Sequence, residues 1–399
     1  MSLERSKAAP LTIRLNLYKL ELTKHPRFRE LLLSHIQDTR SLFVFGFHAI
    51  KELTRALPNF PKSMPNLRSL TLLNNGIAEW TQHIDPFYFS THTLKNLSLR
   101  NVPLYHSFLG HGTLTELALV DLRFNLHLDV LLDFLKKSHS LERASLDIMF
   151  VDPSLRQSRC QTPIGNRLRY LSISCYEAMD GRALISSIAL RRGAALEICY
   201  KGGGAGEADF LVDFLPGIFK THLQNLSSPI FMECRYSQHS VRLLGPGGSF
   251  TFRNCFMLGG NFRESHPLPL ESIRQFRLRY RVPSLPTEIH PSSFHSLEVL
   301  AICDSTSISL VFSKLLPNPT SSPLLKTLAF LNCIITEDFM GELAQFASDR
   351  EGSDSASLHR VVIVGSNEKL PSVDWIERFR ERVPVVDVME GCELPKDLL

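Results

Sequence analysis

Short hexamers with apolar residues at their first, fourth and sixth positions recur along most of the chain. In the first half they are LRSLTL, LKNLSL, LTELAL, LERASL and LRYLSI, which begin at Leu67, Leu94, Leu114, Leu141 and Leu168. In the second half they are IRQFRL, LEVLAI, LKTLAF and LHRVVI, which begin at Ile273, Leu297, Leu325 and Leu358. Within each series the starting points are 20 to 33 residues apart, which indicates a repeated structural unit.

A period of this length is typical of leucine-rich repeats. In such a unit the hexamer forms a strand, a connector follows, and the next strand runs parallel to the first. RSLFVF from Arg40 extends the series upstream. The sequence therefore predicts an α/β fold, an irregular leucine-rich-repeat solenoid with a curved parallel sheet on its concave face and helices on its convex face.

Several connectors between the hexamers have the apolar spacing of helices. They are DVLLDFLKKS from Asp129, RALISSIALRRG from Arg182, SLVFSKLLP from Ser309, TEDFMGELAQFA from Thr336 and DWIERFRERV from Asp374. Thr336 is followed by two acidic residues, as at a helix start, and Gly193 and Pro317 are expected to end helices. Further upstream, we expect a strand over residues 11–17 and a helix over residues 27–36.

Two hexamers are followed by a polar residue eight positions after their first leucine. These residues are Asn75 and Cys333. In leucine-rich repeats this side chain hydrogen-bonds the turning backbone, which would otherwise leave buried amide groups unpaired. Most of the other hexamers lack it, so we expect a divergent array.

We interpret residues 1–399 as a single solenoid. Residues 1–60 are expected to hold the N-terminal repeats or cap, 61–195 the regular repeats, and 263–399 the C-terminal repeats and cap. Residues 196–262 fit the pattern least well, because short strands there are separated by Gly and Pro. We favour degenerate repeats with a local hairpin for this region, and the alternative is an antiparallel insertion.

Composition excludes some classes of function. Of the 399 residues, 44% are hydrophobic and 21% are charged, as in folded soluble proteins, and the net charge of +4 is too small to indicate a nucleic-acid or membrane partner. The eight cysteines show neither CxxC pairs nor the spacing of a small disulfide framework. Because no signal peptide or spanning segment is recognisable, we expect a cytosolic or nuclear protein.

The hexamer register predicts which side chains a partner would meet. Residues between the leucines should project from the concave face. In IRQFRLRYRV the arginines lie roughly 7 Å apart on one face, a spacing that suits phosphate or carboxylate groups; the alternative is a solvated strand face whose charges pair with Glu298 or other neighbours. The candidate partner-binding residues are Arg100, Glu116, Arg143, Asp147, Tyr170, Gln275, Arg277, Arg279 and Arg281.

Two further motifs have simpler interpretations. GGGAG at 202–206 lies between a predicted strand and a predicted helix, but its glycines do not have dinucleotide-binding spacing, and Glu207 would repel a pyrophosphate. LPTEIHPSSF from Leu285 resembles the opening of an F-box, but the hexamer at Leu297 leaves no room for that helical module. We expect the GGGAG motif to form a turn and the LPTEIHPSSF motif to form a loop.

No motif for catalysis, cofactor binding or metal binding is found, since GxSxG, HExxH and P-loop patterns are missing. We therefore expect no catalytic, cofactor or metal residues and no enzymatic activity. The alternative is a hydrolase or transferase with its site in the irregular region 196–262.

The opening LERSKAAPLTIRL, together with PNLRSLTL and ALRRGAALEI, resembles the divergent leucine-rich F-box proteins of mushroom-forming fungi. In that family a similar stretch follows the F-box, which is missing here. The resemblance implies a substrate-recognition role in ubiquitination, with a cullin-type ligase adaptor as a partner only where an F-box lies upstream. We expect a protein–protein interaction module that binds its partner on the concave strand face.

Overall fold

The fold was examined in a computed structural model. It describes residues 11–17, 24–46, 64–74, 93–102, 112–120, 128–148, 162–163, 167–176, 178–201, 228–235, 240–253, 270–280, 294–353, 355–365, 371–391, 393–395 and 398. The predicted motifs at 202–206 and 285–293, together with Asn75 and Arg281, lie outside these ranges. Residue contacts divide the chain into two compact units, Met1–Leu196 (unit 1) and Glu197–Leu399 (unit 2).

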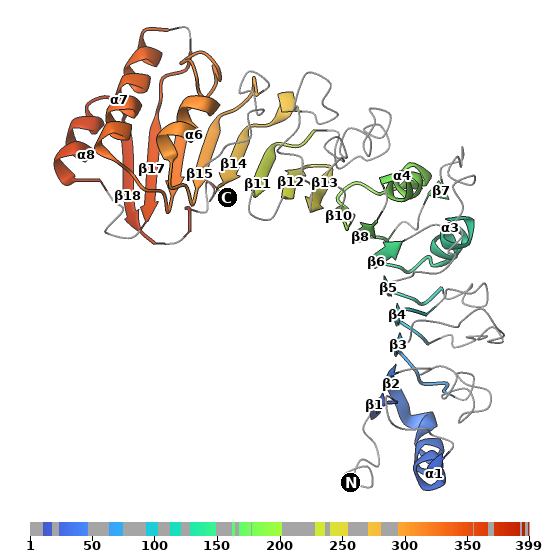
Figure 1. Ribbon diagram of the computed structural model, residues 1–399. Helices are drawn as coiled ribbons and strands as arrows, with labels where there is room; N and C mark the ends of the chain where they lie inside the picture. The colour runs from blue at the N-terminus through green and yellow to red at the C-terminus, as the bar shows by residue number, and fades with distance from the viewer. Residues whose placement is uncertain are drawn as a thin grey trace. The chain divides into compact units, whose positions relative to one another are not determined.

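The described strands form a mostly parallel sheet of sixteen strands, which confirms the predicted α/β class. In unit 1 the strands follow one another in chain order (Figure 1). They are β1 (Leu11–Asn16), β2 (Thr39–Gly46), β3 (Ser69–Asn74), β4 (Asn96–Arg100), β5 (Glu116–Val120), β6 (Arg143–Ile148), β8 (Tyr170–Cys175) and β10 (Ala195–Tyr200), which crosses the unit boundary. A separate pair is formed by β7 (Thr162–Pro163) and β9 (Ile188–Ala189).

The described helices of unit 1 lie along one side of its strands (Figure 1). They are α1 (Pro26–Ser34), the 3-10 helix η3 (Ile36–Asp38), α3 (Leu128–Lys137) and α4 (Ala178–Ser187). The prediction that Gly193 ends a helix is wrong. The helix α4 ends at Ser187, where the hydroxyl groups of Ser186 and Ser187 bond back to the Ala183 carbonyl, and Gly193 lies instead in the turn before β10 with φ +85°.

Unit 2 begins with an antiparallel section. Its strands are ordered β13, β12, β11, β14, β15, β16, β17 and β18, and both β11–β12 and β12–β13 are antiparallel pairs. Their bounds are β11 (Phe231–Arg235), β12 (Ser240–Gly245), β13 (Gly248–Arg253), β14 (Gln275–Arg279), β15 (Val299–Cys303), β16 (Thr327–Leu331), β17 (Arg360–Gly365) and β18 (Val385–Glu390). The described part of region 196–262 therefore continues the sheet, with a hairpin at β12–β13.

The helices of unit 2 are η9 (Leu270–Ser272), α6 (Ile308–Leu315), α7 (Glu337–Glu351) and α8 (Val373–Arg380). Thr336 caps α7 as predicted, because its hydroxyl accepts a hydrogen bond from the Phe339 N–H. Phe339 also contacts Phe330 of β16, with ring centroids 5.4 Å apart. The helix α7 thus packs on one face of the sheet and leaves the opposite face to other side chains. Among the described helices, none is long and apolar enough to cross a membrane.

The hexamer leucines form the core of unit 1. The first leucine of each hexamer is buried just before its strand, and the fourth and sixth residues are buried within it. Two apolar rows cross the neighbouring strands, Leu70, Leu97, Leu117, Ala144, Leu171 and Leu72, Leu99, Leu119, Leu146, Ile173. Burying one leucine contributes about 2 kcal/mol, so these rows hold the strands in one register.

Similar backbone contacts recur from one strand to the next. The N–H groups of Asn96, Glu116 and Arg143 bond the carbonyls of Arg68, Lys95 and Thr115 on the preceding unit of sequence. At the strand ends Asn101, Asp304 and Asn332 have φ of 50°, 58° and 54°, the left-handed conformation that Asn and Asp tolerate best. Each of the three lies seven residues after the first apolar residue of its hexamer, which points to one repeated turn geometry.

Arg350 closes the C-terminal end of α7 and is fully buried. Its guanidinium donates hydrogen bonds to the carbonyl groups of Pro319, Ser322, Pro323, Leu325 and Ala356. Burial lowers the pKa of this guanidinium below its ordinary value. One side chain therefore satisfies carbonyls of the connector that leads into β16 and of the connector that leads into β17.

We expect Arg350→Ala to lower the free energy of unfolding by about 3 kcal/mol, because it leaves several buried carbonyls without donors. Urea unfolding followed by circular dichroism measures the change. The matched control is Arg378→Ala on the exposed surface of α8, which should change stability by less than about 0.5 kcal/mol. Equal effects of the two substitutions would contradict the structural role of Arg350.

Candidate functional site

The face of unit 1 opposite the leucine rows carries polar and small side chains in rows of their own. Because paired residues in a parallel sheet share a face, the printed register aligns Ser69, Asn96, Glu116, Arg143 and Tyr170 in one row. The next row along the strands is Thr71, Ser98, Ala118, Ser145 and Ser172. Long side chains in the first row thus stand beside short ones in the second.

Except for Ser172, the residues of these two rows line a groove of about 340 Å³ on unit 1. Three of the predicted partner-binding residues, Glu116, Arg143 and Tyr170, lie in its wall. The Arg143 guanidinium lies over the Tyr170 ring, 5.2 Å from its centroid, a contact that holds both side chains upright at the rim. The groove floor consists of short side chains and strand backbone, so it is open to an added segment.

Two other predicted residues of unit 1 lie outside the groove lining. Arg100 is exposed at the end of β4. Asp147 is only 4% exposed, which corrects the prediction that it presents its charge to a partner. The hexamer pattern alone does not reveal this burial.

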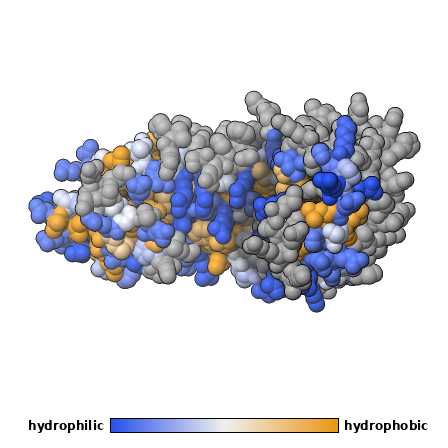
Figure 2. Space-filling view, turned by 90° about the horizontal axis from the view of Figure 1, so that it is seen from below, coloured by the Kyte–Doolittle hydropathy of each residue, from blue (hydrophilic) through white to orange (hydrophobic). Residues whose placement is uncertain are grey.

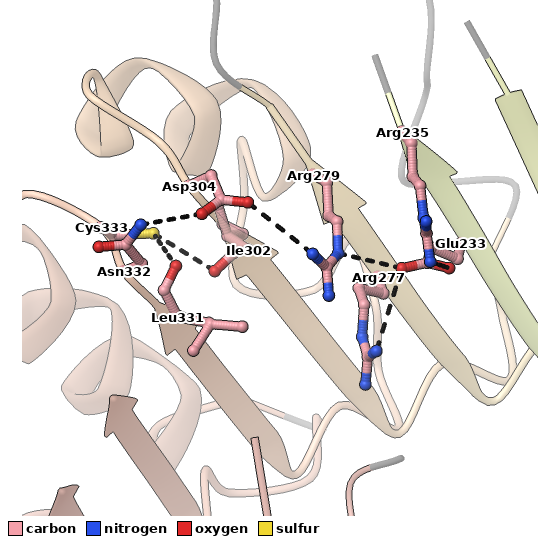
Figure 3. A network of polar contacts seen from close by, with 9 residues as sticks. All are labelled: Glu233, Arg235, Arg277, Arg279, Ile302, Asp304, Leu331, Asn332 and Cys333. Atoms are coloured by element: carbon pink, nitrogen blue, oxygen red, sulfur yellow. Dashed lines mark hydrogen bonds and ion pairs between the residues drawn. The ribbon is translucent and has the colours of Figure 1, made fainter. Parts of the chain in front are cut away.

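In unit 2 the predicted arginine row lies on β14 and meets an acidic residue of β11. Glu233 is paired in register with Arg277 and is only 2% exposed. Its carboxylate accepts hydrogen bonds from Arg235 Nη2 at 2.9 Å and Arg279 Nε at 3.1 Å (Figure 3). Arg277 Nη1 lies 4.0 Å from the same carboxylate. One buried carboxylate therefore organises three arginines.

Arg277 is buried, with 7% of its surface exposed. Its guanidinium lies 5.5 Å from the Phe231 ring centroid, and its Nη2 donates to the Leu398 carbonyl at 3.2 Å. In this structure the C-terminal segment covers Arg277, so this arginine of the predicted row is not accessible to a partner in the free protein. Gln275 and Arg279 are partly exposed.

The network continues from Arg279 toward the strand ends of β15 and β16. Arg279 Nη1 lies 4.0 Å from Asp304 Oδ2, and Asn332 Nδ2 donates to Asp304 Oδ1 at 2.9 Å (Figure 3). The Cys333 thiol donates to the Ile302 carbonyl at 3.3 Å, and this carbonyl belongs to the neighbouring strand β15 and not to the turning backbone. One network of polar contacts therefore connects the arginines of β14 with the residues at the ends of β15 and β16.

Glu233 was not among the residues that sequence reasoning singled out. Its segment carries no hexamer, and the residue paired with it on the partner strand follows 44 residues later in the sequence. The available signal is a lone acidic residue in the apolar run IFMEC, since a charge in a buried strand requires a partner.

Cys303 lies beside this network on β15 and is fully buried. Burial raises the pKa of its thiol to about 12, and the neighbouring Cys333 acts in the same direction. The thiol is therefore protonated at neutral pH and is a poor nucleophile.

Within the described ranges, no group of three or more His, Cys, Asp or Glu side chains has an arrangement that could hold a metal ion. In the described part of region 196–262, side chains contribute to the strands β10 to β13. The charged side chains of this part of the sheet form ion pairs, among them Arg235 with Glu233 and Arg253 with Glu197. No protein-family model matches the chain, and no curated protein matches it.

We expect Glu233→Gln to lower the free energy of unfolding by about 3 kcal/mol, because it leaves the buried Arg277 without its counter-charge. The control is Glu298→Gln, which removes a largely exposed pair with Arg274 at 3.9 Å and should cost less than about 1 kcal/mol. Chemical denaturation of both variants provides the comparison. If the two variants were equally stable, Glu233 would not be the organising charge.

Proposed function

We propose that this protein is a non-catalytic protein-interaction module that binds a segment of a partner protein in the groove of unit 1. The observation that carries the proposal is the row of short side chains bordered by Glu116, Arg143 and Tyr170. The second row is small on each of five neighbouring strands, which leaves space above the strand backbone for a ligand.

The dimensions support a peptide segment as the ligand. The groove runs across the strands β3, β4, β5, β6 and β8. Neighbouring strands are about 4.8 Å apart, so the floor is about 19 Å long. An extended chain rises about 3.3 Å per residue, and the groove therefore accommodates about six residues of a partner.

The charges also support a protein ligand. Glu116 and Arg143 are neighbours in the same row and both are exposed. A nucleic-acid backbone would require a continuous basic track, and the acidic Glu116 interrupts one. A protein segment with charges of both signs matches this wall, while Tyr170 offers an aromatic surface of the kind enriched at binding hot spots.

For the fold we propose an irregular leucine-rich-repeat solenoid. The support comes from the hexamer spacing, the recurring strand-to-strand hydrogen bonds and the repeated left-handed residue at the strand ends. For the biological role we propose a substrate-recognition domain related to F-box ubiquitin-ligase receptors, acting in the cytosol or nucleus. The support for this role is the resemblance in sequence.

Filling the groove tests the binding proposal. Ser98→Arg places a long side chain on the floor, whereas Ser174→Arg makes the same change on the same face of unit 1 outside the lining residues. We expect Ser98→Arg to reduce capture of partner proteins at least tenfold in quantitative affinity purification, and Ser174→Arg to leave it unchanged. Equal capture by both variants would contradict the groove as the binding site.

The proposed link to ubiquitination has a separate readout. The same purification, carried out on the protein as its own cells produce it, should yield a cullin adaptor together with the partner. A partner that depends on the groove without any cullin adaptor would support the interaction module and contradict the ligase role.

A further inference from the structure

The last segment of the chain turns back onto the sheet of unit 2. The strand β18 ends at Glu390, and Gly391 follows with φ +158° while its N–H donates to the Gly365 carbonyl at 3.2 Å. Beyond this turn, Leu394 and Leu398 are 4% and 5% exposed. The chain therefore leaves the edge strand and buries two leucines.

These leucines lie against an apolar surface on β15, β16 and β17, called here the tail surface. It consists of Ala301, Cys303, Ala329, Leu331, Val362 and Val364, with Val299 and Met389 at its margin. In unit 1 the corresponding positions between the leucines are mostly polar or small. An apolar surface of this kind requires a cover in water, and the tail surface has small alanines that leave space for an inserted side chain.

A polar anchor lies at one end of the tail surface. Arg277 Nη2 donates to the Leu398 carbonyl, and the guanidinium is itself held near Glu233 and over Phe231. The donor is thus buried and oriented by neighbours that do not belong to the C-terminal segment. Figure 2 shows hydrophilic side chains gathered over this middle part of unit 2.

The C-terminal segment is bound as a peptide ligand would be. The Leu398 N–H bonds the Pro395 carbonyl at 2.9 Å, and the described residues of this segment, 393–395 and 398, belong to none of the strands of the sheet. Among the described contacts of residues 393–398, the sheet is reached through two leucine side chains and one arginine hydrogen bond. A segment held in this way can leave without breaking any strand pairing.

We propose that the tail surface is a docking site for a short partner segment with two leucines four residues apart, and that the chain's own C-terminal segment occupies it in the free protein. Leu394 and Leu398 are the template for the ligand: two apolar anchors and a backbone carbonyl presented to Arg277. Binding of a partner there releases the C-terminal segment. This site is separate from the groove of unit 1.

The first experiment supplies the C-terminal segment as a peptide. The probe is fluorescein-labelled GSELPKDLL, residues 391–399 with Cys392→Ser. We expect the full chain carrying Leu394→Asp and Leu398→Asp to bind it at least tenfold more tightly than the wild-type chain does, because its own segment no longer competes. A probe in which both of these leucines are replaced by Asp should bind at least tenfold more weakly.

The binding of the labelled peptide is followed by fluorescence anisotropy, and two outcomes of this measurement would overturn the proposal. One is the absence of binding to the folded double variant, and the other is equal affinity for the variant and the wild type. A wild-type dimer that dissociates in the double variant would place the segment of a second copy on this surface and would also overturn it. Ser98→Arg should leave the peptide affinity unchanged, which separates this result from the test of the groove.

A milder variant keeps the proposal testable if the double variant is unstable. In Leu398→Ala, alkylation of Cys303 by iodoacetamide, mapped by mass spectrometry, should accelerate at least tenfold, and excess peptide should restore the slow rate. Cys234 is the internal control, because it is fully buried on the opposite face of β11. Equal acceleration of Cys234 and Cys303, or no rescue by the peptide, would overturn the proposal.

Discussion

The parallel register of the strands is the constraint on which the other features depend. Each leucine of β4 lies beside a leucine of β3 and of β5, and slipping one strand by a single residue would turn its apolar side chains to the other face. The burial of these rows therefore determines which residues remain for the second face. In unit 1 that face holds the groove, and in unit 2 it holds the arginine network and the tail surface.

The face opposite the buried leucine rows carries different side chains in the two units. On β3 to β8 it carries Ser, Thr, Asn and Ala beside a few long polar side chains, and it stays open. On β15 to β17 the same alternation presents Ala301, Cys303, Ala329, Leu331 and Val362, and the C-terminal segment covers it. Between these two kinds of surface lies Glu233, whose burial requires the surrounding arginines as counter-charges.

The fold was predictable from the sequence wherever the information is local. The hexamers contain their own alternation, so their strands were located correctly, and Thr336 followed by acidic residues identified the start of α7. The burial of Arg277 was not predictable in the same way, since the Leu398 carbonyl that meets it is 121 residues away. A weaker signal was present in the hexamers LEVLAI and LKTLAF, which have Val, Thr and Ala where a solvated face would have charges.

The most direct test of this account is the alternation of exposure along one strand. Single cysteines placed at Asn96, Leu97, Ser98 and Leu99 of β4 can be labelled in the native protein, with the sites mapped by mass spectrometry. The account predicts fast labelling at positions 96 and 98 and slow labelling at 97 and 99, where the native leucines are buried. Uniform labelling, or fast labelling at 97 and 99, would contradict the register of unit 1 and with it the proposed groove.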